Sequence, residues 1–166
     1  MSNYNNSPKK GKVDIQNLKN VKVGIIVSEW NPVITKALLK GSITALKKAG
    51  LAEANILVNY VPGSYELPLG AQLLEESSHP DGIICLGCVI QGETPHFDYI
   101  CSAVSEGIMK LNFKYSKPFV FGVLTCNDYQ QAMDRSGGIK GNKGEEAAYT
   151  ALKMIELKQQ LSSKKK

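Results

Sequence analysis

Gly87-Cys88-Val89-Ile90-Gln91-Gly92-Glu93-Thr94-Pro95-His96-Phe97-Asp98-Tyr99 is the stretch that decides the fold. It ends an apolar run that begins at Gly82, passes through a glycine turn and enters a helical pattern near His96. A nearly continuous apolar run is typical of a central strand in a parallel sheet, because both faces of that strand are buried. Such sheets bind ligands at the carboxyl ends of their strands, and the free N–H groups of a helix start attract anions. We therefore predict the active site at this junction.

The rest of the chain repeats the same strand-then-helix pattern. Apolar runs predict further strands at 21–27, 55–60 and 118–125. The helix after the first strand has Asn31 as N-cap and Pro32 as its first residue, and it runs to about Ala49. Further helices are expected to end near 78, to follow His96, to extend from 128 toward 135 and to cover 145–161. This order predicts a flavodoxin-like three-layer α/β sandwich around a four-stranded parallel sheet. A weak strand signal at 13–18 is the candidate for an arm that joins a neighbouring subunit's sheet.

The charge distribution argues against a nucleic-acid-binding face. The chain has 166 residues and a formal net charge of +5. Six lysines lie in two tails without acidic residues, and without them 14 basic face 15 acidic residues. We expect a polar disordered tail at 1–12, a single domain at 13–161 and a basic tail at 162–166. The absence of a long apolar run or of a signal-peptide pattern predicts a cytoplasmic protein without a membrane span.

The four cysteines do not form a persuasive metal or redox pattern. Cys85 and Cys88 have C-x-x-C spacing, but they lie inside an apolar strand pattern, whereas a redox pair opens a helix with an exposed thiol. A zinc site would need a second ligand pair at matching spacing. Cys101 and Cys126 are isolated. We predict structural thiols and no metal site.

The strand ends bring a varied set of side chains to one edge of the sheet. Trp30 lies in a strand-to-helix loop, where it suits either a buried packing residue or a platform for a flat ring. The second junction carries Ser64, Tyr65 and Glu66, and Glu66 at a helix start suits either the helix dipole or ligand hydroxyls. Histidine at a helix start is suited to proton transfer near neutral pH, although a lone histidine such as His96 is as often structural. His79 is expected in an exposed turn at the opposite end of the sheet.

Two cations flank the glycine-rich segment 136–144. Arg135 has the geometry to bind a phosphate through two hydrogen bonds, whereas an exposed loop cation is the commoner situation for Arg135 and Lys143. The sequence has neither the P-loop pattern nor G-x-G-x-x-G after its first strand, and it has no serine nucleophile elbow. These absences disfavour nucleotide and serine-hydrolase chemistry.

At these residues the sequence resembles the lumazine synthase family. The matching stretches occur in family order over most of residues 20 to 157: Trp30-Asn31, Pro62-Gly63-Ser64-Tyr65-Glu66-Leu67-Pro68, residues 87–99, Phe121-Gly122-Val123-Leu124-Thr125, residues 131–137 and Gly141-Asn142-Lys143-Gly144. The resemblance implies condensation of 5-amino-6-(D-ribitylamino)uracil with 3,4-dihydroxy-2-butanone 4-phosphate. The products would be 6,7-dimethyl-8-ribityllumazine, phosphate and water, without a metal or organic cofactor. Asp128 and Gln130 stand where the family often has Thr and Glu, and Gln91 replaces a frequent basic residue.

The resemblance also implies a role for each matching position. His96 would transfer protons, and Lys143 would be a nearby cation. The ribitylaminouracil would be bound by Trp30, Asn31, Ser64, Tyr65, Glu66, Cys88, Val89, Ile90 and a neighbouring subunit's Phe121. The phosphate would be bound by Glu93, Thr94 and, across the interface, Arg135.

A site shared between subunits implies an oligomer. The family forms pentamers, some of which assemble into shells of sixty subunits, and the short loop 137–142 favours a shell here. A riboflavin synthase is a further expected partner. Three alternatives stay open at this point: a flavodoxin-like module that binds a flavin without catalysis, a shell protein with an inactive site, and a lumazine-synthase-like riboflavin synthase.

Overall fold

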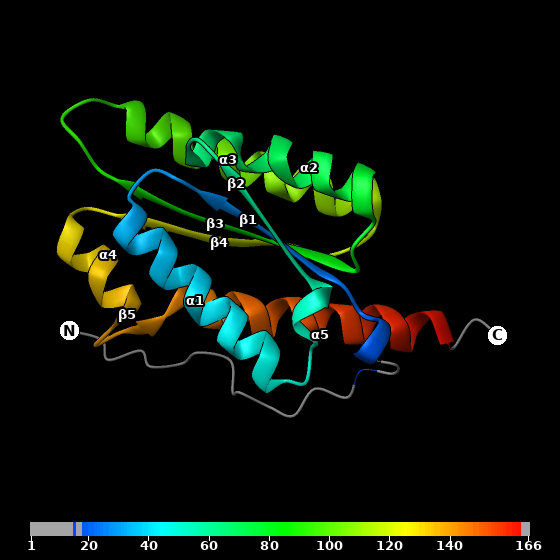
Figure 1. Cartoon of the computed structure of the whole chain (residues 1–166). Coiled ribbons are helices and arrows are strands. Elements are labelled where there is room, and N and C mark those ends of the chain that lie inside the picture. Colours follow the sequence, from blue (N-terminus) through cyan, green and yellow to red (C-terminus); the bar gives the residue numbers. More distant parts are fainter. Residues whose placement is uncertain (1–14, 16–17, 164–166) are drawn as a thin grey trace.

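A four-stranded parallel sheet forms the centre of the molecule, as the sequence predicts (Figure 1). The computed structural model describes residue 15 and residues 18–163. The strands are β1 (Val23–Ser28), β2 (Ile56–Val61), β3 (Gly82–Ile90) and β4 (Phe119–Cys126), in the order β2-β1-β3-β4. β3, the strand with the longest apolar run, is an inner strand and pairs with both β1 and β4. Its predicted bounds agree with the observed strand.

Helices cover both faces of the sheet and complete three layers (Figure 1). α1 (Pro32–Lys48) and α5 (Lys143–Ser163) pack on one face, whereas α2 (Leu67–Ser78) and α3 (His96–Tyr115) pack on the other. The short α4 (Tyr129–Arg135) follows β4. Each long helix connects two parallel strands or ends the chain, as the α/β prediction requires.

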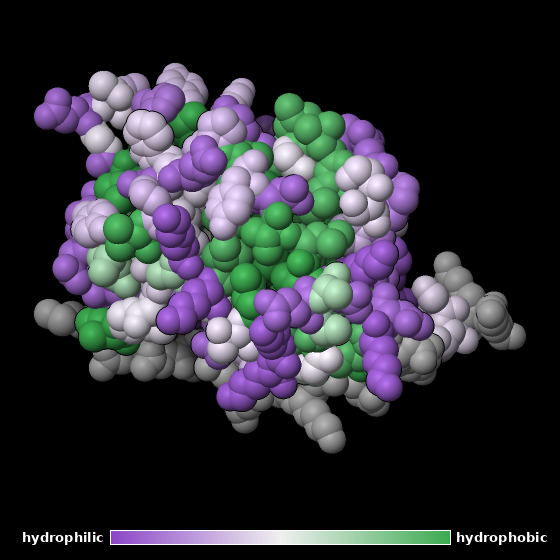
Figure 2. All heavy atoms as spheres, in the orientation of Figure 1, coloured by the Kyte–Doolittle hydropathy of each residue, from purple (hydrophilic) through white to green (hydrophobic). Residues whose placement is uncertain are grey.

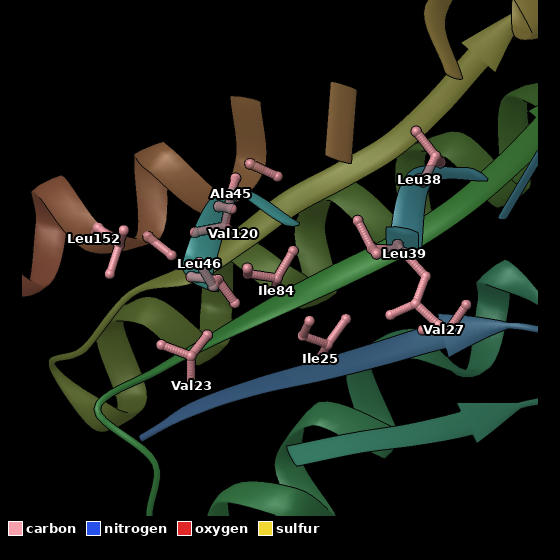
Figure 3. Packing of buried hydrophobic residues seen from close by; sticks show 14 of the residues in the cluster. Val23, Ile25, Val27, Leu38, Leu39, Ala45, Leu46, Ile84, Val120 and Leu152 are labelled. Carbon is pink, nitrogen blue, oxygen red and sulfur yellow. The ribbon is translucent and has the colours of Figure 1, made fainter. Parts of the chain in front are cut away.

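Alternation along the strands sends side chains into two separate cores. Val23, Ile25 and Val27 of β1 point toward α1 and α5, and Figure 3 shows them facing Leu38, Leu46 and their neighbours. Ile26 points the other way, into the core under α2 and α3. Successive residues of a strand face opposite sides of a sheet. Both faces of β1 are therefore buried.

The segment 136–144, predicted as a loop, contains a short antiparallel hairpin instead. β5 (Ser136–Gly138) pairs with β6 (Gly141–Asn142). Gly137 and Gly141 have positive φ angles of 133° and 79°, a conformation that glycine adopts without strain. The hairpin lies against α1, and α5 begins immediately after it at Lys143.

Other predicted element ends differ in detail. The predicted strand at 13–18 falls mostly outside the described residues, as does the tail at 1–12, but Leu18–Asn20 form a 3-10 turn (η1). α5 runs to Ser163, two residues into the segment expected as a basic tail. Asp128 caps α4 by accepting a hydrogen bond from Gln131 N at 2.8 Å. Gln131 Oε1 accepts a hydrogen bond from Asn127 N at 3.2 Å and not from Asp128 N, so the reciprocal pair of bonds of a capping box is only half formed.

The opposite end of the sheet carries a buried ion pair. Lys117 Nζ lies 2.8 Å from Glu75 Oε1 and also donates to the Pro80 carbonyl. His79, at the C-terminal end of α2, is exposed as predicted and lies 3.5 Å from the same carboxylate. This cluster joins the end of α2 to Lys117, two residues before β4, at the end of the sheet away from the predicted site.

Edge strand β2 leaves apolar surface exposed. Its residues Ile56, Leu57, Val58 and Val61 are only half-buried. Figure 2 shows apolar residues gathered in the middle of this face, where β2 crosses the view in Figure 1. In the described part of the chain, no helix is long and apolar enough to cross a membrane.

Candidate active site

A cavity of about 680 Å³ lies at the carboxyl ends of the strands. Residues from the ends of β1, β2 and β3 and from the start of α3 line it: Trp30, Asn31, Gly63, Ser64, Tyr65, Glu66, Cys88, Val89, Ile90, His96 and Ile100. Nine of these eleven residues are ones that the sequence predicts for the site. Three loops that are separate in the chain therefore converge on one cavity of ligand size.

Trp30 projects at the rim of this cavity. Its side chain belongs to the exposed large apolar residues, at 72% exposure. The backbone is fixed, because Trp30 N donates to the Pro62 carbonyl at 3.2 Å and Glu29 N donates to the Val61 carbonyl. The exposure excludes a packing role inside this chain and leaves an indole face available for stacking on a flat ring.

Asn31 precedes α1, as predicted, but its side chain does not cap the helix. The residue adopts the left-handed conformation, at φ 57° and ψ 56°, which Asn tolerates better than most residues. Its Nδ2 donates a hydrogen bond of 3.0 Å to the Cys88 carbonyl. The amide therefore ties the end of β1 to the end of β3 across the floor of the cavity.

The junction after β2 is a 3-10 turn, η3 (Ser64–Glu66). Glu66 Oε2 accepts a hydrogen bond from Gly63 N at 3.0 Å, which holds the carboxylate at the wall of the cavity. Tyr65 is exposed, whereas Ser64 is buried and its hydroxyl has no hydrogen-bond partner in the described structure. The turn thus offers a carboxylate and a phenol to a ligand, whereas the Ser64 hydroxyl is covered.

The floor of the cavity is formed by the last residues of β3. Val89 and Ile90 are half-buried and present an apolar surface, and Cys88 is buried. Burial raises the pKa of the Cys88 thiol to about 12, with a smaller contribution from the neighbouring Cys126, and burial alone raises the pKa of Cys85 to about 12. Both thiols therefore stay protonated at neutral pH, which agrees with the prediction of structural cysteines. In the described residues no cluster of His, Cys, Asp and Glu has the makings of a metal site.

His96 is the first residue of α3 and lines the cavity. The side chain is exposed, so the imidazole can meet a ligand directly. The turn before it is open as well: Gln91 through Pro95 are all exposed. Glu93 and Thr94 lie in this turn but not in the lining of the cavity.

Three predicted residues lie elsewhere in this single chain. Phe121 and Lys143 line a second cavity of about 510 Å³ between α3, β4 and α5. Lys143 Nζ pairs with Glu146 Oε2 at 2.6 Å. Arg135 is exposed at the end of α4 and lines neither cavity. The first cavity is therefore lined by the residues predicted for the pyrimidine and ribityl chain, apart from Phe121, and by His96, but not by the residues predicted for the phosphate.

Sequence reasoning missed two lining residues, Gly63 and Ile100. Ile100 follows His96 by one helical turn, and residues four apart lie on the same helix face. That spacing was a signal that Ile100 borders the same cavity.

Comparison with known proteins agrees with this geometry. The family model described as 6,7-dimethyl-8-ribityllumazine synthase matches residues 20–159. A protein of that name from Cytophaga hutchinsonii is 55% identical over 142 residues, covering 86% of this chain and 89% of the relative. Those from Bacteroides fragilis and Parabacteroides distasonis are 54% and 53% identical, covering 82% and 80% of this chain and 95% and 83% of the relatives. With most of its length matched by the family model and by these relatives, the chain belongs to the 6,7-dimethyl-8-ribityllumazine synthase family.

Proposed function

We propose that the cavity at the carboxyl ends of β1, β2 and β3 binds 5-amino-6-(D-ribitylamino)uracil and condenses it with 3,4-dihydroxy-2-butanone 4-phosphate. Membership of the family makes the chain a transferase of riboflavin biosynthesis. The products are 6,7-dimethyl-8-ribityllumazine, phosphate and water. The observation that carries the site assignment is the convergence of nine predicted residues on one cavity. A flavin-binding or shell protein without catalysis is not favoured by this relationship.

The cavity suits the pyrimidine and its polyhydroxyl chain. The exposed indole of Trp30 stacks on the ring, and Val89 and Ile90 support it from the floor. Glu66 binds hydroxyls of the ribityl chain, and Ser64 contributes to this part of the site as a lining residue.

The reaction asks for proton transfers and for a stabilised leaving group. The amine attacks the ketone and the adduct loses water to give an imine, phosphate leaves, and ring closure with loss of a second water completes the lumazine. His96 is placed to move protons, because its exposed imidazole borders the cavity. No step needs a nucleophile from the protein. Bringing two substrates together in the correct orientation therefore supplies much of the rate.

The phosphate site and Phe121 require a second copy of the chain. Glu93 and Thr94 present the turn before α3 to the phosphate, joined by Arg135 of a neighbouring copy. Phe121 lies beside a different cavity in its own chain, which supports a contribution of this residue to the pyrimidine site of a neighbouring copy. Exposed apolar side chains such as Phe113, at 77% exposure, are available for such an interface. The expected assembly is a pentamer, and the short hairpin 136–142 favours a sixty-subunit shell.

The test is a spectroscopic assay with both substrates, from which the uncatalysed reaction is subtracted. Enzyme-dependent appearance of the lumazine chromophore supports the proposal. Folded protein that gives no excess over background refutes it, and a light-scattering mass equal to one pentamer refutes the shell. The enclosed riboflavin synthase and the cytoplasmic location stay predictions.

A further inference from the structure

One hydrogen bond links two walls of the candidate site. Asn31 Nδ2 donates to the Cys88 carbonyl at 3.0 Å, although the two residues are 57 positions apart in the chain. Trp30 precedes Asn31 at the rim, Val89 follows Cys88 on the floor, and all four residues line the same cavity. The Asn31 side chain therefore ties the residue proposed to stack on the ring to the strand end proposed to support that ring.

This hydrogen bond lies where the regular pairing of β1 with β3 has ended. The two strands pair only as far as Leu86, whereas β3 continues to Ile90. The main chain after β1 bonds to the β2 side, where Trp30 N donates to the Pro62 carbonyl at 3.2 Å. In a regular parallel pair, backbone N–H groups of one strand donate to carbonyls of the next. Beyond Leu86 the Asn31 side chain supplies such a donor to β3.

The backbone of Asn31 adopts a conformation that surrounding contacts have to maintain. Its φ of 57° and ψ of 56° lie in the left-handed region, which costs free energy for residues other than glycine. Such conformations persist where the structure around them holds them, and they are common at functional sites. The Asn31 carbonyl accepts hydrogen bonds from Ile34 N at 3.0 Å and from Thr35 N at 3.1 Å. The main chain of Asn31 is therefore held by α1 and its side chain by β3.

We propose that Asn31 is a positioning residue, whose amide sets the separation between the Trp30 indole and the end of β3. This separation is the width of the slot that receives the pyrimidine ring. Trp30 is 72% exposed, so packing within the chain does little to hold its indole. The position of the indole therefore depends on the backbone around it, which is bonded to Pro62 at Trp30 itself and is fixed by Asn31 at the next residue.

This role differs from the direct binding of substrate that the family resemblance implies for Asn31. A residue that only binds the substrate affects affinity and leaves the indole of the ligand-free protein as it was. A positioning residue affects both, and its effect on affinity depends on the presence of Trp30. The inference rests on the proposed binding of the ribitylaminouracil in this cavity.

The experiment compares Asn31→Asp and Asn31→Gly with the unmodified full-length protein. Aspartate has nearly the same shape and tolerates the left-handed conformation, but its carboxylate cannot donate to the Cys88 carbonyl. Glycine adopts the conformation without strain and removes the amide altogether. Asn55→Asp is the matched control, because Asn55 Nδ2 also donates to a main-chain carbonyl, that of Lys19 at 2.8 Å, and Asn55 lies just before β2, at the other end of that strand from the site.

Trp30 is the only tryptophan of the chain, so its fluorescence reports on this wall of the site without any ligand. Time-resolved anisotropy should show faster and wider local motion of the indole in both Asn31 variants than in the unmodified protein and in Asn55→Asp. Circular dichroism establishes that each variant is folded. Unchanged motion of the indole in folded Asn31 variants, or an equal change in Asn55→Asp, overturns the positioning role.

The second measurement is calorimetric binding of 5-amino-6-(D-ribitylamino)uracil alone. Loss of one hydrogen bond should raise its Kd about 3- to 10-fold in both Asn31 variants. In a Trp30→Ala background, Asn31→Asp should add less than about 2-fold, because without the indole there is no slot width to maintain. Effects of the two substitutions that multiply mean that Asn31 acts on the substrate independently of Trp30. That result overturns the proposal, as does an unchanged Kd.

The two measurements separate this inference from the proposed function. An unmodified protein that binds the ribitylaminouracil but forms no lumazine refutes the proposed reaction, and the Kd and the anisotropy then still decide the role of Asn31. An active enzyme whose Asn31 variants keep the indole motion of the unmodified protein refutes the positioning role and leaves the reaction intact.

Discussion

Gly41 and Asn142 form a pair whose mutual dependence can be measured. The Asn142 amide joins three parts of the fold: Nδ2 donates to the Ala37 and Ser136 carbonyls at 2.9 Å each, and Oδ1 accepts from Gly144 N at 2.9 Å and from Glu145 N at 3.3 Å. It thus caps α5 and fastens the β5–β6 hairpin to α1. The three atoms nearest to a Cβ built on Gly41 all belong to this amide. A methyl group on Gly41 therefore has to displace Asn142.

The magnitudes follow from these contacts. Asn142→Ala removes four hydrogen bonds at about 1 kcal/mol each, so the free energy of unfolding should fall by about 3–4 kcal/mol. Gly41→Ala alone should cost about 1–3 kcal/mol through overpacking. Once Asn142 is alanine the space is free, and Gly41→Ala should instead stabilise the helix by about 0.8–1 kcal/mol. The predicted interaction energy between the two positions is therefore roughly 2–4 kcal/mol.

The assay is urea unfolding followed by far-UV circular dichroism, at one fixed protein concentration because assembly contributes to stability. Thr44→Ala is the control, since Thr44 is an exposed position on the same helix and its effect should be equal in both backgrounds. The sign reversal at Gly41 is the decisive observation. If Gly41→Ala costs the same with and without Asn142, the contact does not limit that position and the reasoning is wrong.

Four further predictions concern the site and the cores. His96→Ala should lower kcat by about 100-fold yet leave turnover above background, because orientation of the substrates supplies much of the rate; complete loss in a folded variant would contradict this. Arg135→Ala should raise KM for the phosphorylated substrate by about 10- to 100-fold, and steady-state kinetics that show no change would remove its phosphate role. Burial raises the pKa of Cys85 to about 12, so between about pH 9 and 12 the unfolded chain releases a thiol proton that the folded chain keeps. The free energy of unfolding should therefore fall over this pH range. Cys85→Ala should make the fall shallower when the free energy of unfolding is measured against pH. Lys117→Met leaves Glu75 buried without its partner and should cost about 3–5 kcal/mol in thermal or urea unfolding, whereas Lys114→Met at an exposed pair should have a much smaller effect.

The parts of the fold that the sequence predicted are those that depend on local patterns. β3 is apolar on both faces and is bounded by Gly82 and by the polar turn after Ile90. Both predicted ends of this strand therefore match the observed ends. Pro32 fixes the start of α1 in the same local way. The lining of the first cavity was predictable for a related reason. Parallel strands bring their carboxyl ends to one edge, so residues after β1, β2 and β3 must meet.

The features that escaped prediction depend on contacts between distant residues. Asn31 is a residue type that is favoured at the N-cap, but its side-chain amide donates a hydrogen bond to the Cys88 carbonyl, 57 residues away. The hairpin 136–142 has a loop-like composition, and it is held in place by Asn142 reaching Ala37 across 105 residues. A short polar side chain has several hydrogen-bonding options of similar energy. Tertiary packing determines which of these hydrogen bonds forms, and the local sequence therefore does not predict it.

The separation of the predicted site residues within one chain has a consequence for catalysis. β3 supplies the floor of the first cavity, whereas Phe121 belongs to β4 at the edge of the sheet and borders another cavity. An edge strand is available to a neighbouring molecule, and a residue on it can complete a neighbour's site more readily than its own. If Phe121 and Arg135 act as proposed, a single chain binds the pyrimidine incompletely and lacks the guanidinium at the phosphate. Dilution that dissociates the assembly should then abolish turnover while each chain keeps its fold, so activity would depend on protein concentration in a way that circular dichroism does not.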